Sequence, residues 1–317
     1  MTTLRIGTRA SRLALVQTEK VAASLQDEGG VSVEIVHYQT SGDRIQDKPL
    51  EPHLGSSFFT KEIEIALLTD QIDVAVHSCK DLATRLPDGL EITALTCRED
   101  PRDVMVVSDK SVLEEGAVAT IGTLSPRRRG FLRFSRPSLT FADLRGNVPT
   151  RVRAVEEGRI DGAVLAAAGL QRLDMSPHIS QFLDPDELLP AAGQGALAIQ
   201  CRNDDDITKK FVQRLDHTPT RVVVEAERAC LRRLEAGCQS PVGAFGDLEG
   251  DSLRLRAGVA TPHELVRAEE MVNAPWDPEI LGRSVAEKLL AEIGVASLLE
   301  CEWAGIAPRL LPGEESK

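Results

Sequence analysis

An aspartate that follows a buried strand is the first residue of this chain whose position suggests chemistry. Residues 72–77 (Ile-Asp-Val-Ala-Val-His) are typical of a strand, and Ser78-Cys79-Lys80-Asp81 comes directly after it. At the carboxyl end of a strand in an α/β sheet, the Asp81 carboxylate would face the ligand cleft. There it could meet a cationic or N–H-bearing reactant. An aspartate that only caps the next turn, with Lys80 in solvent, is from position alone the slightly simpler interpretation.

Arginine is unusually frequent relative to lysine. The chain has 28 Arg and 9 Lys, and residues 111–208 contain eleven Arg and no Lys. Arginine presents a planar, permanently charged fork that binds carboxylate or phosphate through two hydrogen bonds. A solvated surface with salt bridges explains any single arginine, whereas the whole block is equally well explained by an anion-binding cleft.

At two predicted helix starts, arginines lie where a bound anion would be stabilising. Ser125 is a predicted N-cap, Pro126 suits the first helical position, and Arg127 and Arg128 follow in the first turn. Cations in a first turn oppose the helix dipole, and a bound anion would relieve this mismatch. Residues 144–151 repeat the arrangement of a turn, a helix start and flanking arginines.

The cysteines and histidines do not form a metal-binding pattern. The six cysteines include no C-x-x-C, and the six histidines include no pair spaced four apart, so free thiols and no metal site are expected. Cys97 and Cys201 are expected to be small buried residues. Cys238 lies in the Gly-containing turn at 235–241 and is the best candidate for a reactive or modified thiol.

The order of predicted elements indicates two α/β units and a different third one. Strands are expected at 4–8, 31–38 and 72–77, with helices at 11–25 and 60–69. After a boundary at 98–103 the pattern restarts, and Ile121-Gly122-Thr123 echoes Ile6-Gly7-Thr8. A second crossing is expected at 189–195, followed by a strand at 196–201. The last part contains predicted helices at 220–234 and 278–293 and strands at 253–259 and 265–272.

These boundaries predict three domains. The first comprises residues 1–97 and 196–216, the second 102–191, and the third 218–310. The fold class is therefore α/β: two tandem domains joined by two crossings that form a hinge, with a C-terminal α+β domain. Ligands of such sheets bind at the carboxyl ends of strands, where helix N-termini offer free N–H groups.

Composition excludes several classes of function. The 317 residues have a net charge of −12 and only 3% aromatic residues, which argues against nucleic acid as a partner. The longest run without Asp, Glu, Lys or Arg is 14 residues, 188–201, and Pro190 interrupts it. It is shorter than the roughly 18–20 apolar residues of a membrane span. Without a basic-then-apolar leader at the N-terminus, a cytoplasmic location is expected.

Taken together, these segments resemble the hydroxymethylbilane synthase family, also called porphobilinogen deaminases. The resemblance extends from Arg5 to about Val259, and it is the order and spacing of the segments that are specific. The matching segments are Ile6-Gly7-Thr8-Arg9 with Ser11, 77–81, 98–103, Gly122-Thr123 with Ser125 and Arg127-Arg128, 144–151, Ala168-Gly169-Leu170 with Arg172, Gly193-Gln194-Gly195 and 234–238.

The resemblance implies a fold, a reaction and a cofactor. The first two domains would be like those of periplasmic binding proteins. The family joins four porphobilinogen molecules head to tail, releasing ammonia each time, and water then frees a linear tetrapyrrole. The chain grows on a dipyrromethane held by a thioether to the cysteine that matches Cys238. The aspartate matching Asp81 hydrogen-bonds pyrrole N–H groups and stabilises the cationic azafulvene-like species formed as ammonia leaves.

A monomer is expected. By the same resemblance, ten further residues would hold cofactor and substrate carboxylates. They are Arg9, Ser11, Ser78, Lys80, Ser125, Arg127, Arg128, Arg145, Arg151 and Arg172.

One departure concerns the loop in which the family has Gly-Lys-Gly. This chain has Gly55-Ser56-Ser57, so Ser56 replaces a lysine that meets a carboxylate, and Ser56→Lys is expected to lower the Michaelis constant for porphobilinogen. A non-catalytic, two-lobed anion receptor is the alternative function. The presence of both Asp81 and Cys238 argues against it.

Overall fold

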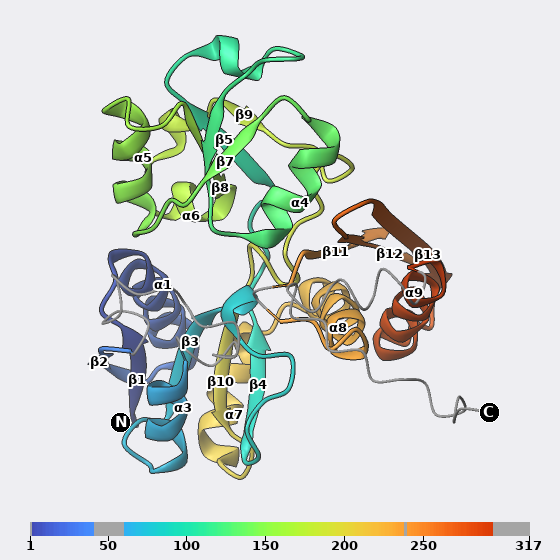
Figure 1. Ribbon diagram of the computed structural model, residues 1–317. Helices are drawn as coiled ribbons and strands as arrows, with labels where there is room; N and C mark the ends of the chain where they lie inside the picture. Colours follow the sequence, from blue (N-terminus) through green and yellow to red (C-terminus); the bar gives the residue numbers. More distant parts are fainter. Residues whose placement is uncertain (1, 41–59, 238–239, 294–317) are drawn as a thin grey trace, which may run out of the picture.

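The computed structural model describes residues 2–40, 60–237 and 240–293. The strands of this part of the chain form three sheets, two with five strands and one with three. Figure 1 shows the two larger sheets in separate lobes, one above the other, with the third sheet and its helices beside them.

The first lobe has a sheet covered by helices on both faces. Strand β1 is parallel to β2 and β3, while β10 is antiparallel to β3 and β4. Leu25 of α1 packs on one face and Ile63 of α3 on the other, so β3 is buried along nearly its whole length. The elements are β1 (Thr3–Arg9), α1 (Arg12–Gly29), β2 (Ser32–Tyr38), α3 (Lys61–Leu68), β3 (Val74–Ser78), β4 (Leu90–Leu95), β10 (Leu197–Arg202) and α7 (Asp206–Val212).

The second lobe repeats this topology. Its strand order is β7-β6-β8-β5-β9, which corresponds strand by strand to β2-β1-β3-β10-β4. Gly7 of β1 pairs with Ala75, and Gly122 of β6 pairs with Ala163, so the Ile-Gly pairs of the echoed tripeptides occupy equivalent strands. The elements are β5 (Asp103–Val107), β6 (Thr120–Gly122), α4 (Pro126–Ser135), β7 (Thr140–Ala142), α5 (Val148–Glu156), β8 (Gly162–Ala166), α6 (Ala167–Arg172) and β9 (Gln181–Phe182).

Two chain segments connect the lobes. Residues 96–102 lead from β4 to β5, and residues 183–196 return from β9 to β10, so the predicted pair of crossings is present. The crossings are hydrogen-bonded to each other, since the Glu99 amide donates to the Gly195 carbonyl (3.1 Å) and Arg98 Nε donates to the Gln194 carbonyl (2.8 Å).

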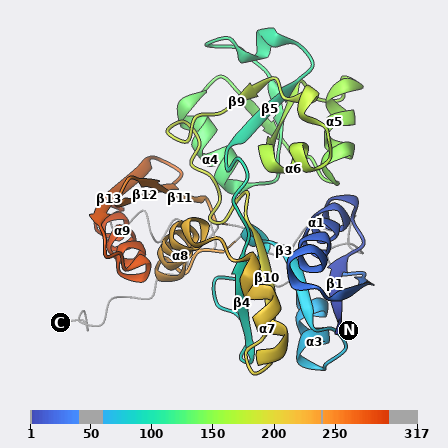
Figure 2. The same ribbon diagram turned by 180° about the vertical axis from the view of Figure 1, so that it is seen from behind.

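The C-terminal part has one more strand than the sequence predicted. Strand β11 pairs antiparallel with β12, but Gly243 and Gly246 interrupt its apolar pattern. A Cβ at Gly243 would lie 2.6 Å from Leu189 Cβ, so close packing requires glycine there. Figure 2 shows α8 between the first lobe and this sheet. The elements are α8 (Thr218–Arg233), β11 (Val242–Glu249), β12 (Ser252–Ala260), β13 (Leu265–Asn273) and α9 (Pro278–Glu292).

The fold class is therefore the predicted one, two α/β lobes and a C-terminal α+β unit, whereas the domain boundaries stay predictions. Among the described helices, none combines the length and the apolar composition that crossing a membrane would require.

Candidate functional site

The turn that carries Asp81 is fixed by backbone hydrogen bonds. A short 3-10 turn, η2 (Cys79–Asp81), follows β3. Cys79 is fully buried, and its amide donates to the carbonyl of Ala196 on the second crossing (3.0 Å). The side chain of Asp81 accepts no hydrogen bond and forms no ion pair with any residue in the described ranges. Its carboxylate is therefore available to a reactant.

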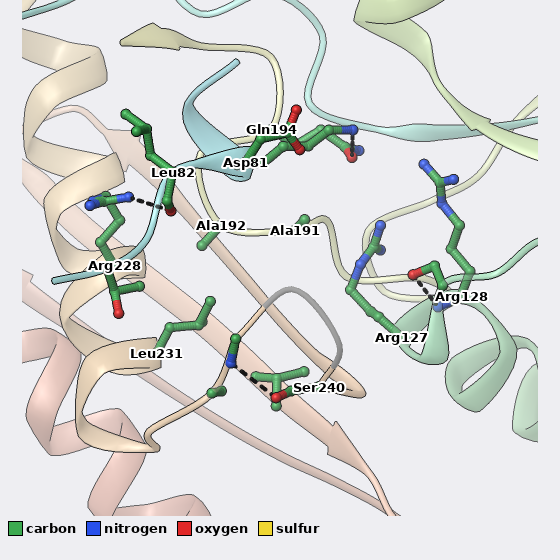
Figure 3. Close-up of a pocket in the computed structure, with 16 residues that line it drawn as sticks. Asp81, Leu82, Arg127, Arg128, Ala191, Ala192, Gln194, Arg228, Leu231 and Ser240 are labelled. Carbon is green, nitrogen blue, oxygen red and sulfur yellow. Dashed lines mark hydrogen bonds between the residues drawn. The ribbon is translucent and has the colours of Figure 1, made fainter. Parts of the chain in front are cut away.

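Asp81 lines a cavity of about 210 Å³ to which both lobes and the C-terminal part contribute. In Figure 3, Asp81 and Gln194 lie on one side of the cavity and Arg127 and Arg128 on another. The lining residues are Lys80, Asp81, Leu82, Thr84, Ser125, Arg127, Arg128, Ala191, Ala192, Gln194, Arg228, Leu231, Ala236, Gly237, Ser240 and Val242.

The predicted cofactor attachment point, Cys238, lies outside the described residues, as does Ser56. The residues on either side of the undescribed pair 238–239 are Gly237 and Ser240, and both line the cavity. The Gly237 amide donates to Ser240 Oγ (3.0 Å). The chain on both sides of Cys238 therefore borders the same cavity as Asp81.

Lys80 is a partly buried cation beside this carboxylate. Its Nζ lies 3.2 Å from Oε1 of Gln194, whose Nε2 donates to the carbonyl of Pro101 on the other crossing (2.6 Å). Burial lowers the pKa of Lys80 to about 8, and the charge of Asp81 opposes this shift.

Arg127 and Arg128 have a protein carboxylate that sequence reasoning missed. Asp103, the first residue of β5, is fully buried and accepts from Arg127 Nη1 through Oδ2 (2.7 Å). Its Oδ1 accepts from Arg128 Nη2 (2.8 Å) and Nε (3.0 Å). The prediction that a bound anion relieves the cations of this first turn therefore needs correction, because Asp103 already supplies one anion. The three groups retain one net positive charge at the cavity.

The cap predicted at Ser125 is confirmed, and the structure adds a second cap, Asn147, at the predicted helix start within 144–151. Ser125 Oγ accepts from the Arg128 amide (3.4 Å) at the start of α4. At the start of α5, Asn147 Oδ1 accepts from the Thr150 amide (2.9 Å). Arg151 donates Nε to the Gly146 carbonyl (2.8 Å). Burial, followed by the nearby charge of Arg128, lowers the pKa of Arg151 to about 10, and Arg151 forms no ion pair within the described chain.

The remaining predicted residues lie outside the lining of this cavity. Arg172 donates Nη2 to the Gly195 carbonyl (2.7 Å), and its Nε is 2.7 Å from Glu99 Oε2, so a protein carboxylate already occupies part of its fork. Ser11 caps α1, and Ser78 Oγ accepts from Gln17 Nε2 (3.0 Å). Those that do not line it are Arg9, Ser11, Ser78, Arg145, Arg151 and Arg172.

The cysteines of the described chain are free thiols, as predicted. Cys201 is buried, and burial raises its pKa to about 12. Cys97 is exposed, so its prediction as a small buried residue was wrong; it lies on the first crossing, where the chain leaves the core of the sheet. No group of three or more His, Cys, Asp or Glu side chains in the described ranges could hold a metal ion.

The fold and the cavity define a protein with two α/β lobes and a C-terminal α+β part. Its site combines several arginines with an aspartate that has no partner within the described ranges. Sequence comparison places the chain in a family. The family model described as porphobilinogen deaminase, dipyromethane cofactor binding domain, matches residues 4–210, and the model of the C-terminal domain of the same family matches residues 222–291. The chain belongs to the porphobilinogen deaminase family.

A near full-length relative agrees with this assignment. A porphobilinogen deaminase of Geobacter sulfurreducens is 44% identical over 299 residues, which cover 94% of each chain. Two solved structures that match are more distant in sequence. Lipoprotein Tp32 of Treponema pallidum matches 68% of this chain and 90% of its own with a TM-score of 0.44 and 11% identity. The match to a methionine-bound nutrient binding protein of Burkholderia cenocepacia covers 66% of this chain and 90% of that protein, with a TM-score of 0.41 and 14% identity.

Proposed function

We propose that this chain is a transferase that catalyses the reaction of its family, hydroxymethylbilane synthesis. Porphobilinogen is the substrate, four molecules are joined with release of ammonia, and water releases the linear tetrapyrrole. The observation that carries the proposal is one cavity lined by Asp81, by Arg127 and Arg128, and by the residues on both sides of Cys238.

The residues around the cavity fit a dipyrromethane cofactor. A thiol at Cys238 would attach it, and the carboxylates of its acetate and propionate groups suit arginine forks. When bound, the cofactor supplies the free pyrrole carbon onto which substrate is joined. Arg127 and Arg128 present one net positive charge after pairing with Asp103, and Lys80 is a further cation on the opposite lobe. These residues would hold carboxylates on both sides of the reacting ring.

Asp81 is the residue best placed to act on the reacting ring. Its carboxylate has no partner among the described side chains and lies at a cavity wall, where pyrrole N–H groups could donate to it. A fixed anion stabilises the positive charge that develops on the ring as ammonia leaves, because it needs no reorganisation at that moment. Asp81 would therefore hold the ring by its N–H and lower the barrier electrostatically.

The arginines must act locally. The chain has a net charge of −12, so its long-range field repels a substrate with two carboxylates. A cleft in which arginines are concentrated overcomes this repulsion at short range. We further propose that the protein acts in the cytoplasm as a monomer, and sedimentation of the holoprotein tests the second statement.

The intact mass of the protein tests cofactor attachment at Cys238. We expect the purified chain to carry the added mass of two linked pyrroles and to give a colour reaction for pyrroles. Cys238→Ser should abolish both, whereas Cys97→Ser and Cys201→Ser should retain both. A bare-chain mass in freshly prepared, active protein would contradict the proposal.

The role of Asp81 is tested by turnover of porphobilinogen. Asp81→Ala should remove nearly all activity and leave the melting temperature close to that of the parent, because this side chain has no described protein partner to lose. Asp81→Glu should keep part of the activity, since the charge survives at a different reach. Turnover of Asp81→Ala near the parent rate would show that another residue stabilises the ring.

A further inference from the structure

Helix α8 leads to the predicted attachment point and also contacts the segment that follows Asp81. Its C-terminal end leads through Ala236 and Gly237 to Cys238, so it carries the predicted attachment loop. Its middle turns face residues 82–84, which come directly after the turn of Asp81. In Figure 3, Arg228 reaches from α8 to Leu82 on the side of the cavity away from Arg127 and Arg128.

Arginines of α8 bind three successive carbonyls of this segment. Arg228 donates Nη1 to the Leu82 carbonyl (3.3 Å) and Nη2 to the Ala83 carbonyl (2.6 Å). One turn later on the same helix face, Arg232 donates Nη1 to the Thr84 carbonyl (3.4 Å). The planar fork of Arg228 thus fixes two neighbouring peptide groups at once.

Arg228 is an unusual cation for this part of the protein. It is only 6% exposed, and within the described chain it forms no ion pair, whereas the similarly buried Arg127 has Asp103. A buried guanidinium is costly unless its N–H groups are satisfied. The two carbonyls supply that satisfaction, so the helix and the segment after Asp81 are held in one relative placement.

The segment that follows Asp81 needs hydrogen-bond donors from other parts of the chain, such as Arg228. Residues 82–89 form no helix or strand, so no regular ladder accepts or supplies their hydrogen bonds. The Leu82 amide closes η2 by donating to the Cys79 carbonyl (3.2 Å), and the carbonyl of the same Leu82 receives Arg228. The Leu82 amide belongs to the peptide shared with Asp81, and the Leu82 carbonyl belongs to the next peptide, shared with Ala83. A shift of that carbonyl would therefore reach Asp81 through Leu82.

We propose that Arg228 is a positioning residue, assisted by Arg232, which sets the Asp81 carboxylate relative to helix α8. The proposal rests on the proposed function, since it needs Asp81 as the catalytic group and Cys238 as the attachment point. Correct placement matters because a misplacement of about 1 Å can reduce a rate by about 100-fold.

The effects of an Arg228 substitution on kcat and on KM distinguish a positioning role from a substrate-binding role. Arg228→Gln should lower kcat about tenfold or more while the KM for porphobilinogen changes less than about twofold, because the proposed carboxylate-binding arginines stay in place. The dipyrrole mass should remain, since the thiol is untouched. Arg228→Lys, which keeps the charge but lacks the planar fork, should be intermediate. If Arg228→Gln does not fold, the kcat of Arg228→Lys tests the proposal by itself.

Arg233→Gln is the matched control. Arg233 is five residues further along α8, and its Nε pairs with Glu287 of α9 (2.6 Å), entirely within the C-terminal part. The change is chemically identical but does not touch the segment after Asp81. We expect its kcat to stay within about twofold of the parent value.

A double-mutant cycle tests whether Arg228 acts through Asp81. On the Asp81→Glu background the carboxylate is already displaced, so Arg228→Gln should cost a clearly smaller factor in kcat than in the parent. Equal losses on both backgrounds, a rise in KM as the main effect, or a parent-like kcat of both Arg228 variants would overturn the proposal. Absence of porphobilinogen turnover or of the dipyrrole mass in the parent protein would instead refute the proposed function, whereas an active Asp81→Ala variant would refute only the role of Asp81.

Discussion

Lys80 and Asp81 are neighbours in the chain, but their side chains have different surroundings. Asp81 has no described partner, whereas Lys80 contacts Gln194 and lies near the charges of Asp81, Asp103, Arg127 and Arg128. Burial is the largest influence on Lys80 and lowers its pKa to about 8. A lysine with this pKa loses its charge as pH rises through about 8, which is a lower pH than for a lysine in water.

This pKa predicts a pH dependence of substrate affinity. As pH rises through about 8, Lys80 loses its proton, so a carboxylate held by its ammonium should be bound more weakly and KM should increase. Lys80→Arg keeps its charge over the whole range and should flatten the increase between pH 7 and 9. Steady-state kinetics of both proteins across this interval measure the effect. The same increase in both would mean that Lys80 does not contact the substrate.

At the scale of single elements, the two lobes place a glycine at corresponding positions of β1 and β6. A Cβ on Gly122 would lie 2.6 Å from Leu144 Cδ2 and 2.8 Å from Leu144 Cβ. These contacts are far shorter than van der Waals distance, and Leu144 directly precedes Arg145. Close packing of this strand against the loop that follows β7 therefore requires glycine.

Gly122→Ala should destabilise the protein by about 1–3 kcal/mol, because the added methyl group overpacks the contact with Leu144. Gly169→Ala in α6 is the control, since its Cβ would meet nothing closer than 3.6 Å. That change should be neutral or stabilise by up to about 1 kcal/mol through helix propensity. Urea unfolding of both variants measures the difference, and equal midpoints would contradict the packing argument.

At the scale of the whole molecule, one buried carboxylate joins the two crossings to the C-terminal part. Glu227 of α8 is fully buried, and its Oε1 accepts from Arg98 Nη1 (2.6 Å) and the Gly246 amide (2.8 Å). Its Oε2 accepts from the Gly193 amide (2.7 Å). Arg98 and Gly193 belong to different crossings, so Glu227 fixes the region in which all three units meet.

Glu227→Gln should lower the free energy of unfolding by about 3–5 kcal/mol, because it leaves the Arg98 cation buried without its counter-ion. Glu225→Gln is the control on the same helix. Glu225 pairs with Arg221 at 3.2 Å, but 47% of its side chain is exposed, so the loss should be below about 1 kcal/mol. Chemical denaturation of the two variants gives both values. A similar small loss in both would show that the buried network is not a main contributor to stability.

The sequence by itself determined the features that depend on neighbouring residues. The strand-like run at 72–77 placed Asp81 just after the carboxyl end of a strand, and Ser125 with Pro126 marked the start of α4. Such signals can be recognised because strand alternation and helix capping act over a few residues. The repeated Ile-Gly-Thr motif likewise predicted two similar lobes, and its Ile-Gly pairs lie in the equivalent strands β1 and β6.

The tertiary structure decided which charges meet. Asp103 neutralises part of the Arg127–Arg128 pair from 24 and 25 residues away, and Arg228 binds the segment after Asp81 from 145 and 146 residues away. No periodicity or cap encodes these contacts, because they depend on how the lobes and α8 pack together. For the same reason, the sequence indicated an arginine-rich cleft, but only the fold distinguished arginines with an internal carboxylate from those available to a ligand.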